Sequence, residues 1–179
     1  DGNIWFATRS GILRYDGYLW TSYTTQDGLA DNSTRDVIQD RDGVMWIGYS
    51  RSGITRFASK AEKDAWRHYN MDDGLVGMTM QWGGLCLASD GSIWTSLRGG
   101  GGGTGGVCRF DGKTWKRVDL PKEYSEVGVR HITSSTDGNL WFSINRGILR
   151  YDGAEWVHYS TADGLAQGGR YRVIPFSDE

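Results

Sequence analysis

Arginine and aromatic side chains are the groups in this 179-residue chain whose chemistry is most suggestive. A guanidinium binds a carboxylate or sulfate through two parallel hydrogen bonds, and an aromatic ring stacks on the C–H face of a sugar. Such side chains gathered at one place would suit an acidic saccharide or another small anion. The candidate ligand-binding residues are Arg9, Arg35, Arg51, Trp82, Arg98, Tyr124, Arg130, His131, Arg146 and Tyr171.

The residues needed for catalysis are few. His68 and His158 occupy the same place in a repeated W-x-H-Y motif, and His131 is the third histidine. One histidine near the expected site, without a partnered nucleophile or a metal-ligand cluster, does not make a catalytic constellation. We therefore expect no catalytic residues, no metal site, no cofactor and no enzymatic activity.

Composition narrows the class of protein further. The net charge of −2 and the pI near 5.9 lack the basic excess of nucleic-acid binders, and the apolar stretches are too short to span a membrane. Neither a nucleic-acid partner nor a membrane span is expected. The 27 Gly, 9 Trp and 9 Tyr favour many short strands joined by tight turns, because glycine costs about 1 kcal/mol against alanine inside a helix.

The elements that position these residues repeat along the chain. Asp-Gly followed by two residues and Trp occurs four times, and each copy is followed by a block related to G-I-L-R-Y-D-G. The period of roughly 45 residues is typical of repeat architectures. The repeats cover residues 1–41, 42–89, 90–136 and 137–179, and the motif starts at Asp1, Asp42, Asp90 and Asp137.

Each repeat contains short blocks of aromatic and β-branched residues bounded by Asp-Gly or Ser-Gly, which is typical of strands joined by hairpin turns. For the second four-stranded unit we expect strands at 34–39, 45–49, 54–57 and 66–69, the first of them ahead of the Asp42 motif. Four antiparallel strands at this period predict a propeller blade. The chain is therefore predicted to be all-β, a single β-propeller domain over residues 1–179 with four four-stranded antiparallel blades and almost no helix.

Residues that are the same in every repeat are best explained by a structural role within the blade. We expect the eight tryptophans at repeat positions to pack between blades, and the repeated arginines, such as Arg14 and Arg109, to hold each blade through an ion pair or a stack. An anion-binding ring is the alternative for these arginines.

Cys86 and Cys108 fall on strands separated by another strand, and two spacings of about 4.8 Å exceed the reach of a disulfide. Both are expected to be free thiols.

The two ends of the chain bear on closure of the ring. The chain opens in the middle of a repeat, so we expect a piece of a longer or processed protein, and it ends on a segment that resembles a first strand. We expect residues 172–176 to pair with the strand opened by Ile4 and to close the ring within one chain. The alternative is half of an eight-bladed dimer in which this segment crosses to a second copy. Monomer and homodimer both stay open.

Antiparallel strands also sort the charged residues onto two rims. The turns after the first and third strands of each blade share one rim, which collects Asp16, Asp111 and Asp152 among others. The remaining turns share the opposite, basic rim, which collects the candidate arginines together with Arg170 and Arg172. The candidate ligand site lies on this basic rim. Equally, Trp82 and Tyr171 could plug a narrow four-bladed channel.

Three linked motifs carry a resemblance to a known family. W-F-A-T-R-S-G-I-L-R-Y-D-G, Y-T-T-Q-D-G-L-A-D-N-S and V-I-Q-D-R-D-G-V-M-W-I-G together resemble the two-component regulator propeller repeat of bacterial hybrid two-component systems. The resemblance covers essentially the whole chain. It implies a sensor propeller that recognises an extracytoplasmic ligand, often a carbohydrate, without catalysis. It also implies a periplasmic or extracellular location.

A weaker resemblance is to streptogramin lyases, whose propeller repeats also contain D-G-x-x-W-F. It would imply an enzyme with a histidine base beside a bound magnesium ion, but this chain has D-G-L where their connecting segments are expected. A third alternative is a structural propeller unit whose blades assemble with other copies into a larger ring.

Overall fold

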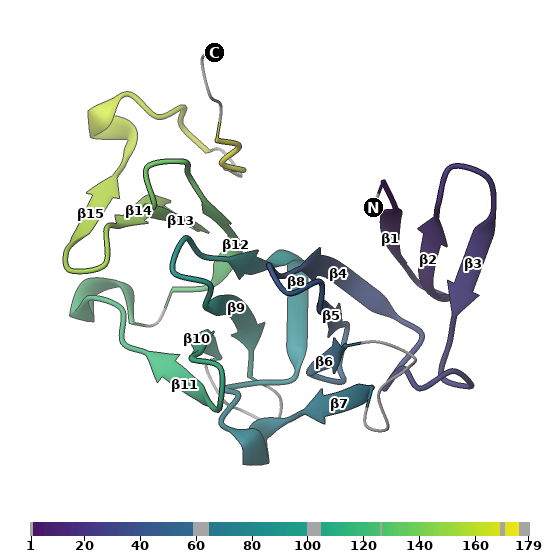
Figure 1. Cartoon of the computed structure of the whole chain (residues 1–179). Coiled ribbons are helices and arrows are strands. Elements are labelled where there is room, and N and C mark those ends of the chain that lie inside the picture. The colour runs from purple at the N-terminus through teal and green to yellow at the C-terminus, as the bar shows by residue number, and fades with distance from the viewer. Residues whose placement is uncertain (1, 59–64, 100–104, 126, 169–170, 176–179) are drawn as a thin grey trace.

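The computed structural model of this chain describes residues 2–58, 65–99, 105–125, 127–168 and 171–175, without the side chain of Trp82. Its strands form four antiparallel sheets, one for each repeat, and within each sheet the strands lie in chain order (Figure 1). The first blade consists of β1 (Ile4–Thr8), β2 (Gly11–Tyr15) and β3 (Trp20–Tyr23). The second consists of β4 (Thr34–Gln39), β5 (Met45–Tyr49), β6 (Ile54–Phe57) and β7 (Trp66–Tyr69).

The third and fourth blades repeat this plan. The third consists of β8 (Thr79–Leu87), β9 (Ile93–Arg98), β10 (Gly106–Phe110) and β11 (Trp115–Val118), and the fourth of β12 (Val129–Ser134), β13 (Leu140–Ile144), β14 (Gly147–Tyr151) and β15 (Trp156–Tyr159). The helices in the described residues are single 3-10 turns, η1 (Met71–Asp73), η2 (Lys122–Tyr124) and η3 (Thr161–Asp163). The all-β prediction is confirmed, and the strands predicted for the second four-stranded unit have the observed bounds.

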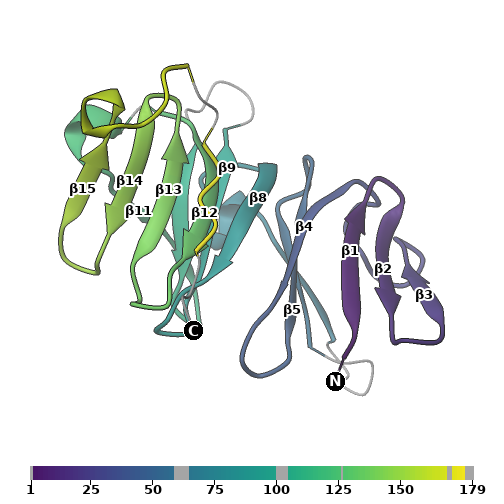
Figure 2. The same ribbon diagram turned by 90° about the horizontal axis from the view of Figure 1, so that it is seen from above.

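The blades stand side by side in an arc, with the first and fourth blades at its two ends (Figures 1 and 2). The strands on the inner side of the arc are packed against one another in the order β1, β4, β8 and β12. The arc is therefore built from consecutive blades, as in a propeller. None of the helices in the described part of the chain is long and apolar enough to cross a membrane.

The hydrophobic core is divided among the spaces between neighbouring blades. One cluster joins the first and second blades, a second joins the second and third, and a third joins the third and fourth. Trp46, Trp94 and Trp115 are between 2% and 4% exposed, which confirms the inter-blade position predicted for them. Trp20 is 59% exposed and departs from that prediction.

Both cysteines lie in the third blade as predicted. Cys86 on β8 and Cys108 on β10 are buried and free, and β9 runs between them. Burial raises the pKa of each thiol to about 11.

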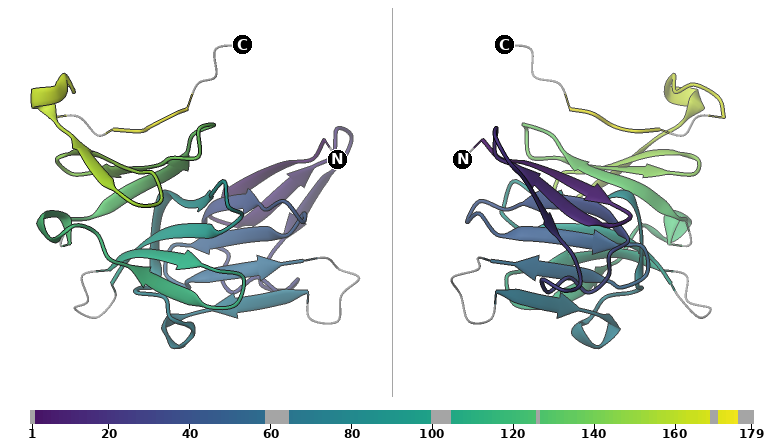
Figure 3. Two further views of the ribbon diagram at one scale, coloured as in Figure 1. Left: turned by 60° about the vertical axis from the view of Figure 1, so that its left-hand side comes forward. Right: turned by 90° about the vertical axis from the view of Figure 1, so that its right-hand side faces the viewer.

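The predicted closing strand is not formed in the described residues. The first sheet contains only β1, β2 and β3, and Tyr171–Pro175 lie outside any strand, while residue 176 lies outside the described part of the chain. Figure 3 shows this segment, drawn in yellow, on the side of the fourth blade and away from β1. Tyr171 and Arg172 line a cavity together with residues of β4, β8 and β12. The described residues 171–175 are not paired with β1 of the same chain, and closure of the ring by this segment stays a prediction.

Candidate ligand-binding cavity

Each four-stranded blade carries a β-bulge on its inner strand. On β4, the step from Thr34 to Asp36 lies opposite the single step from Tyr49 to Gly48, so Arg35 is an extra residue. Bulges re-aim side chains and are common beside binding sites. The bulge on β4 therefore gives its arginine a direction that regular pleating would not.

The bulge on β12 follows the same pattern. The step from Val129 to His131 lies opposite Ile144 to Ser143, which makes Arg130 the extra residue. On β8 the irregular stretch is longer and lies between Met80 and Leu85. Three neighbouring inner strands thus become irregular at equivalent places.

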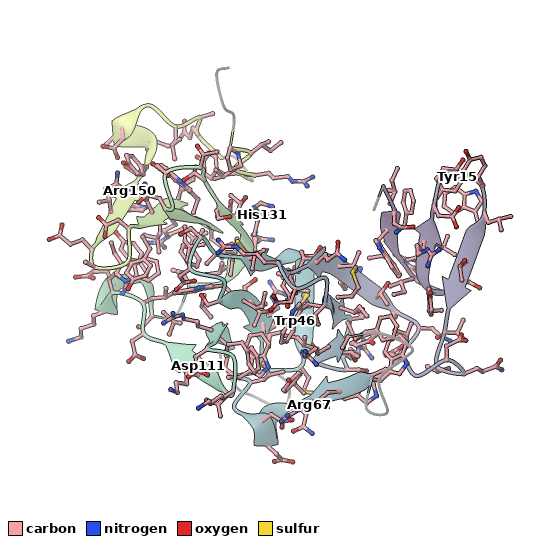
Figure 4. All side chains as sticks on the ribbon, viewed as in Figure 1. Tyr15, Trp46, Arg67, Asp111, His131 and Arg150 are labelled. Atoms are coloured by element: carbon pink, nitrogen blue, oxygen red, sulfur yellow. The ribbon has the colours of Figure 1, made fainter. Side chains whose placement is uncertain are left out.

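These irregular segments surround one cavity of about 470 Å³ on the inner side of the arc. Figure 4 shows His131 on this inner side, whereas Asp111 and Arg150 lie farther out. Three arginines and one aspartate give the lining a basic excess. The cavity is lined by Arg35, Asp36, Gln81, Gly83, Arg130, His131, Tyr171 and Arg172.

Neighbouring groups hold the basic side chains of the cavity. Arg35 donates from Nη2 to Ser50 Oγ at 3.1 Å, and Arg130 donates from Nε to Asn145 Oδ1 at 2.9 Å. Both acceptors are neutral, so neither of these bonds cancels the charge of its guanidinium. The hydroxyl of Tyr171 donates to the carbonyl of Ala166, which fixes one end of the ring.

Asp36 is the acidic group of the cavity. Its Oδ2 accepts from the Leu85 N–H at 2.9 Å and its Oδ1 from the Val37 N–H at 3.0 Å. Burial raises the pKa of Asp36, although these two hydrogen bonds act in the opposite direction. The bond to Leu85 ties β4 to the irregular part of β8, so Asp36 helps to shape the cavity.

His131 packs directly over Gly83. A Cβ atom on Gly83 would lie 2.3 Å from Cδ2 of His131, and Gly83 has a φ of +72°. Glycine suits this position because it accepts the positive φ and has no Cβ that would clash with His131. Burial, with a contribution from the charge of Arg172, lowers the pKa of His131, and its Nδ1 has no hydrogen-bond partner among the described residues.

Of the ten residues predicted for the site, four line this cavity: Arg35, Arg130, His131 and Tyr171. The other candidate arginines are exposed and lie outside the cavity lining: Arg9, Arg51, Arg98 and Arg146.

Two aromatic candidates remain. Tyr124 lies on η2, with its ring centroid 4.8 Å from that of His158, and it packs against the core cluster of the third and fourth blades. It does not line the cavity. The side chain of Trp82 lies outside the described residues, so whether this residue plugs the channel stays untested.

Three lining residues were not predicted for the site: Asp36, Gln81 and Gly83. Asp36 follows the bulge arginine on β4 just as His131 follows the one on β12. Aligning Val37 with Ile132 in the sequence would have found it. Arg172, expected on the basic rim, also lines the cavity.

A larger cavity, of about 590 Å³, lies between the third and fourth blades towards the other rim. Its acidic and basic lining residues are equal in number, Asp90, Asp111 and Asp152 against Arg109, Lys116 and Arg117, and two ion pairs join Arg109 to Asp90 at 2.7 Å and Lys116 to Asp111 at 2.8 Å. Arg109 also lies 6.0 Å from the ring centroid of Trp94, which supports a scaffold role for this repeated arginine. Chemistry therefore favours the smaller, basic cavity as the ligand site.

Fold and site together define a β-propeller with a basic cavity beside its inner strands. Residues 28–51 match the family model of the two component regulator propeller, which confirms over those residues the resemblance seen in the motifs. No curated protein matches the sequence.

Solved structures show the same fold. The extracellular domain of BT3049 from B. thetaiotaomicron, assigned to a hybrid two component system, has a TM-score of 0.73 and 23% identity over 94% of this chain and 23% of its own. That of BT4673, assigned to a one component system of the same organism, has a TM-score of 0.68 and 20% identity over 88% of this chain and 22% of its own.

Virginiamycin B lyase from Staphylococcus aureus has a TM-score of 0.67 and 21% identity over 89% of this chain and 52% of its own. The chain therefore spans less than a quarter of the two extracellular domains and about half of the lyase.

Proposed function

We propose that this chain is part of a non-catalytic, extracytoplasmic sensor-type propeller, and that its inner cavity binds an acidic saccharide or a similar anion. The observation that carries the proposal is the pair of bulges that bring Arg35 and Arg130 to one cavity with Arg172.

The remaining lining suits a sugar acid. The ring of Tyr171 can stack on the C–H face of a sugar, while guanidinium groups take the carboxylate or sulfate in the bidentate manner. Gln81 adds neutral donors and an acceptor for hydroxyl groups. The extracytoplasmic setting follows the two extracellular domains that share the fold.

Calorimetric titration with oligogalacturonate and with the matching neutral galactose oligomer tests the proposal. The acidic oligomer is expected to bind more tightly, and its affinity to fall steeply with salt, because exposed charges are screened over about 8 Å at physiological ionic strength. Equal affinity for the two oligomers would contradict an anion site.

A matched pair of arginine variants locates the site. Arg130→Ala removes a guanidinium of the cavity, whereas Arg9→Ala removes an exposed one on the same rim. Hydrogen bonds to charged groups contribute about 1.5–3 kcal/mol, so Arg130→Ala should weaken binding by about tenfold or more and Arg9→Ala hardly at all. Equal losses would assign binding to the rim as a whole and reject the cavity.

Lyase-like chemistry is the second candidate, favoured by the shared fold and by His131 lying in the same cavity as Asp36. It predicts turnover of the saccharide that depends on a divalent metal and is lost in His131→Gln. Binding without turnover, with and without magnesium, would support the sensor function.

A further inference from the structure

Two neighbouring interfaces between blades each contain a crevice towards the acidic rim. The crevice between the second and third blades has a volume of about 430 Å³, and the one between the third and fourth blades has a volume of about 590 Å³. Their lining residues correspond through the repeat, with Arg56, Arg67 and Phe110 in the former holding the places of Arg109, Lys116 and Tyr151 in the latter. The two crevices are therefore the same feature of the fold, lined by different side chains.

One repeat position distinguishes the two crevices. The last residue of the outer strand is Tyr23, Tyr69 and Tyr159 in β3, β7 and β15, but it is Val118 in β11. Each tyrosine ring stacks on the tryptophan of the Asp-Gly motif in its own blade, with centroids 5.7–5.9 Å apart and interplanar angles of 18–29°. Valine has no ring, so Trp94 in the third blade lacks this stacking partner.

The missing ring changes how far the crevice reaches. Tyr69 lines the crevice between the second and third blades, here called the tyrosine crevice, and Trp46 is not among the described residues that line it. In the other, here called the valine crevice, Val118 is half-buried and the lining extends to Trp94 and Leu140. The valine crevice is thus a deeper pocket, and it lies between two four-stranded blades.

The inner part of the valine crevice suits an aromatic ring. Trp94 lies 5.9 Å from Tyr151 of the opposite blade, between ring centroids, and its indole N–H donates to Ser92 Oγ at 2.9 Å, which holds the indole in place. A ring over Val118 would find the partner that the tyrosines find in the other blades, since aromatic rings pair at offsets of about 4.5–7 Å. The volume also falls within the range of about 300–1,000 Å³ that is usual for small-molecule sites.

The mouth of the valine crevice offers groups of both charges. Lys116 donates to Asp111 Oδ2 at 2.8 Å, and its ammonium group has two further hydrogens for another acceptor. Asp152 accepts two turn N–H groups through Oδ1, and no described residue donates a hydrogen bond to its Oδ2. A carboxylate and an ammonium group can therefore both find a partner at this mouth.

The tyrosine crevice has a different mouth. The charged residues among its described lining are all basic: Arg56, Arg67 and Lys113. A gap of the size of a ring and charges of both signs thus occur together in the valine crevice and not in its neighbour.

We propose that the valine crevice is a second ligand site and that it takes a free aromatic amino acid. The ring lies over Val118 in the place of the missing tyrosine, beside Trp94. The carboxylate faces Lys116 and the ammonium group faces Asp152. A zwitterion matches the equal numbers of acidic and basic side chains in the lining, and the ring matches the gap left at one repeat position. The site shares no lining residue with the basic cavity and does not depend on its ligand.

Calorimetric titration of the full chain with L-phenylalanine tests the class of ligand. One equivalent is expected to bind per chain. L-leucine carries the same charged groups without an aromatic ring, and it should bind about tenfold more weakly or worse, because aromatic pairs gain free energy beyond the burial of area. Equal affinity for leucine, or no binding of phenylalanine at millimolar concentration, would overturn the proposal.

N-acetyl-phenylalaninamide tests the part played by the charges. It carries the ring without the ammonium and carboxylate groups, so it should also bind about tenfold more weakly or worse, since hydrogen bonds to charged groups are the stronger ones. Equal affinity for this compound would overturn the free amino acid as the ligand and would assign the pocket to an aromatic side chain of a peptide.

Val118→Tyr locates the site, because it restores the residue of the other three repeats. The new ring should fill the pocket beside Trp94, weaken phenylalanine binding by about tenfold or more and raise the melting temperature by about 2 °C or more. Val118→Thr keeps the size of the side chain and is the matched control, which should bind phenylalanine like the wild type. Unchanged affinity in a folded Val118→Tyr variant would overturn the proposal.

Nuclear Overhauser effects in the wild-type chain test the same position without a variant. With phenylalanine bound, its ring protons should show contacts to the methyl groups of Val118 and to the indole protons of Trp94. The absence of both contacts in the saturated complex would overturn the proposal even if Val118→Tyr failed to fold.

The two proposed ligands separate this site from the basic cavity. Val118→Tyr should bind oligogalacturonate like the wild type, and Arg130→Ala should bind phenylalanine like the wild type. Loss of phenylalanine binding in Arg130→Ala would move the amino acid to the basic cavity and overturn the valine crevice as its site. A chain that binds phenylalanine in the expected way and ignores oligogalacturonate would support this site and reject only the anion site.

Discussion

The two rims of the arc carry opposite charges and use them differently. On the acidic rim, Asp16, Asp111 and Asp152 each accept two backbone N–H groups of the turn that follows. On the basic rim, Arg35 and Arg130 stand on bulges and bond to neutral side-chain oxygens. These aspartates shape turns, whereas Arg35 and Arg130 bond to side chains beside the cavity.

The pKa values of the aspartates follow the same division. Hydrogen bonds from the backbone N–H groups of Leu19 and Tyr18 lower the pKa of Asp16, and those of Glu155 and Ala154 lower that of Asp152. Burial in the basic cavity raises the pKa of Asp36 instead. A count of charges along each rim therefore does not predict a site until the charges bonded within turns are set aside.

The largest effect expected is the loss of a scaffold residue beside the acidic rim. Trp94→Ala empties a space against Phe142 and Tyr151 and should cost about 3–5 kcal/mol in the free energy of unfolding. Arg130→Ala in the basic cavity should change it by about 0.5 kcal/mol or less. Urea denaturation measures both, and a loss of stability in Arg130→Ala as large as that in Trp94→Ala would remove the distinction between the rims.

A pair of glycine variants should give the next largest effect. Gly17 in a turn of the acidic rim has a φ of +98° with open space where a Cβ would stand, whereas Gly83 has a φ of +72° and His131 at 2.3 Å from such a Cβ. Gly17→Ala should cost about 1 kcal/mol from backbone strain, and Gly83→Ala should cost more because His131 must also move.

The difference between the two melting temperatures measures this clash. Displacement of His131 should also change its NMR chemical shifts in Gly83→Ala and leave them unchanged in Gly17→Ala. Equal melting temperatures would mean that His131 does not rest on Gly83.

The repeated strands could be predicted from the sequence, whereas the bulges that interrupt them could not. Strands such as β5 and β6 were predicted with their observed bounds because hairpin turns and alternating aromatics mark each end. The bulges at Arg35 and Arg130 could not be predicted, since one extra residue in a strand leaves the pattern of residue types unchanged. The bulges stand at two of the arginines that line the cavity, whereas Arg9 and Arg51 lie in turns outside its lining.

Closure of the ring is a different case. The likeness of Val173 to Val37 predicts an inner-strand segment, but its pairing depends on the curvature summed over all blades, so closure within one chain stays a prediction. Curvature is set by packing at the inter-blade interfaces, where residues such as Phe110 and Trp115 fix the angle between sheets. No local motif encodes it.

The smallest expected effect is a pH dependence that separates the rims. Burial lowers the pKa of His131 from its ordinary value of 6.5, so the unfolded chain binds protons more readily there. Its contribution to stability is complete above pH 6.5 and is lost as the pH falls towards the folded-state pKa. Asp16 and Asp152, whose pKa values are lowered from 3.8, lose their contribution only as the pH falls below 3.8.

Unfolding midpoints measured from about pH 7 down to pH 3 should therefore decline in two stages. His131→Gln should flatten the upper stage, leaving the part due to His68, whose pKa burial also lowers. Asp152→Ala should change the lower stage alone.

Protonation of His131 also adds positive charge to the cavity, so affinity for oligogalacturonate should rise as the pH falls through the upper stage, and this rise should vanish in His131→Gln. An affinity that stays constant across this pH range would place the anion away from His131, and with it away from the cavity.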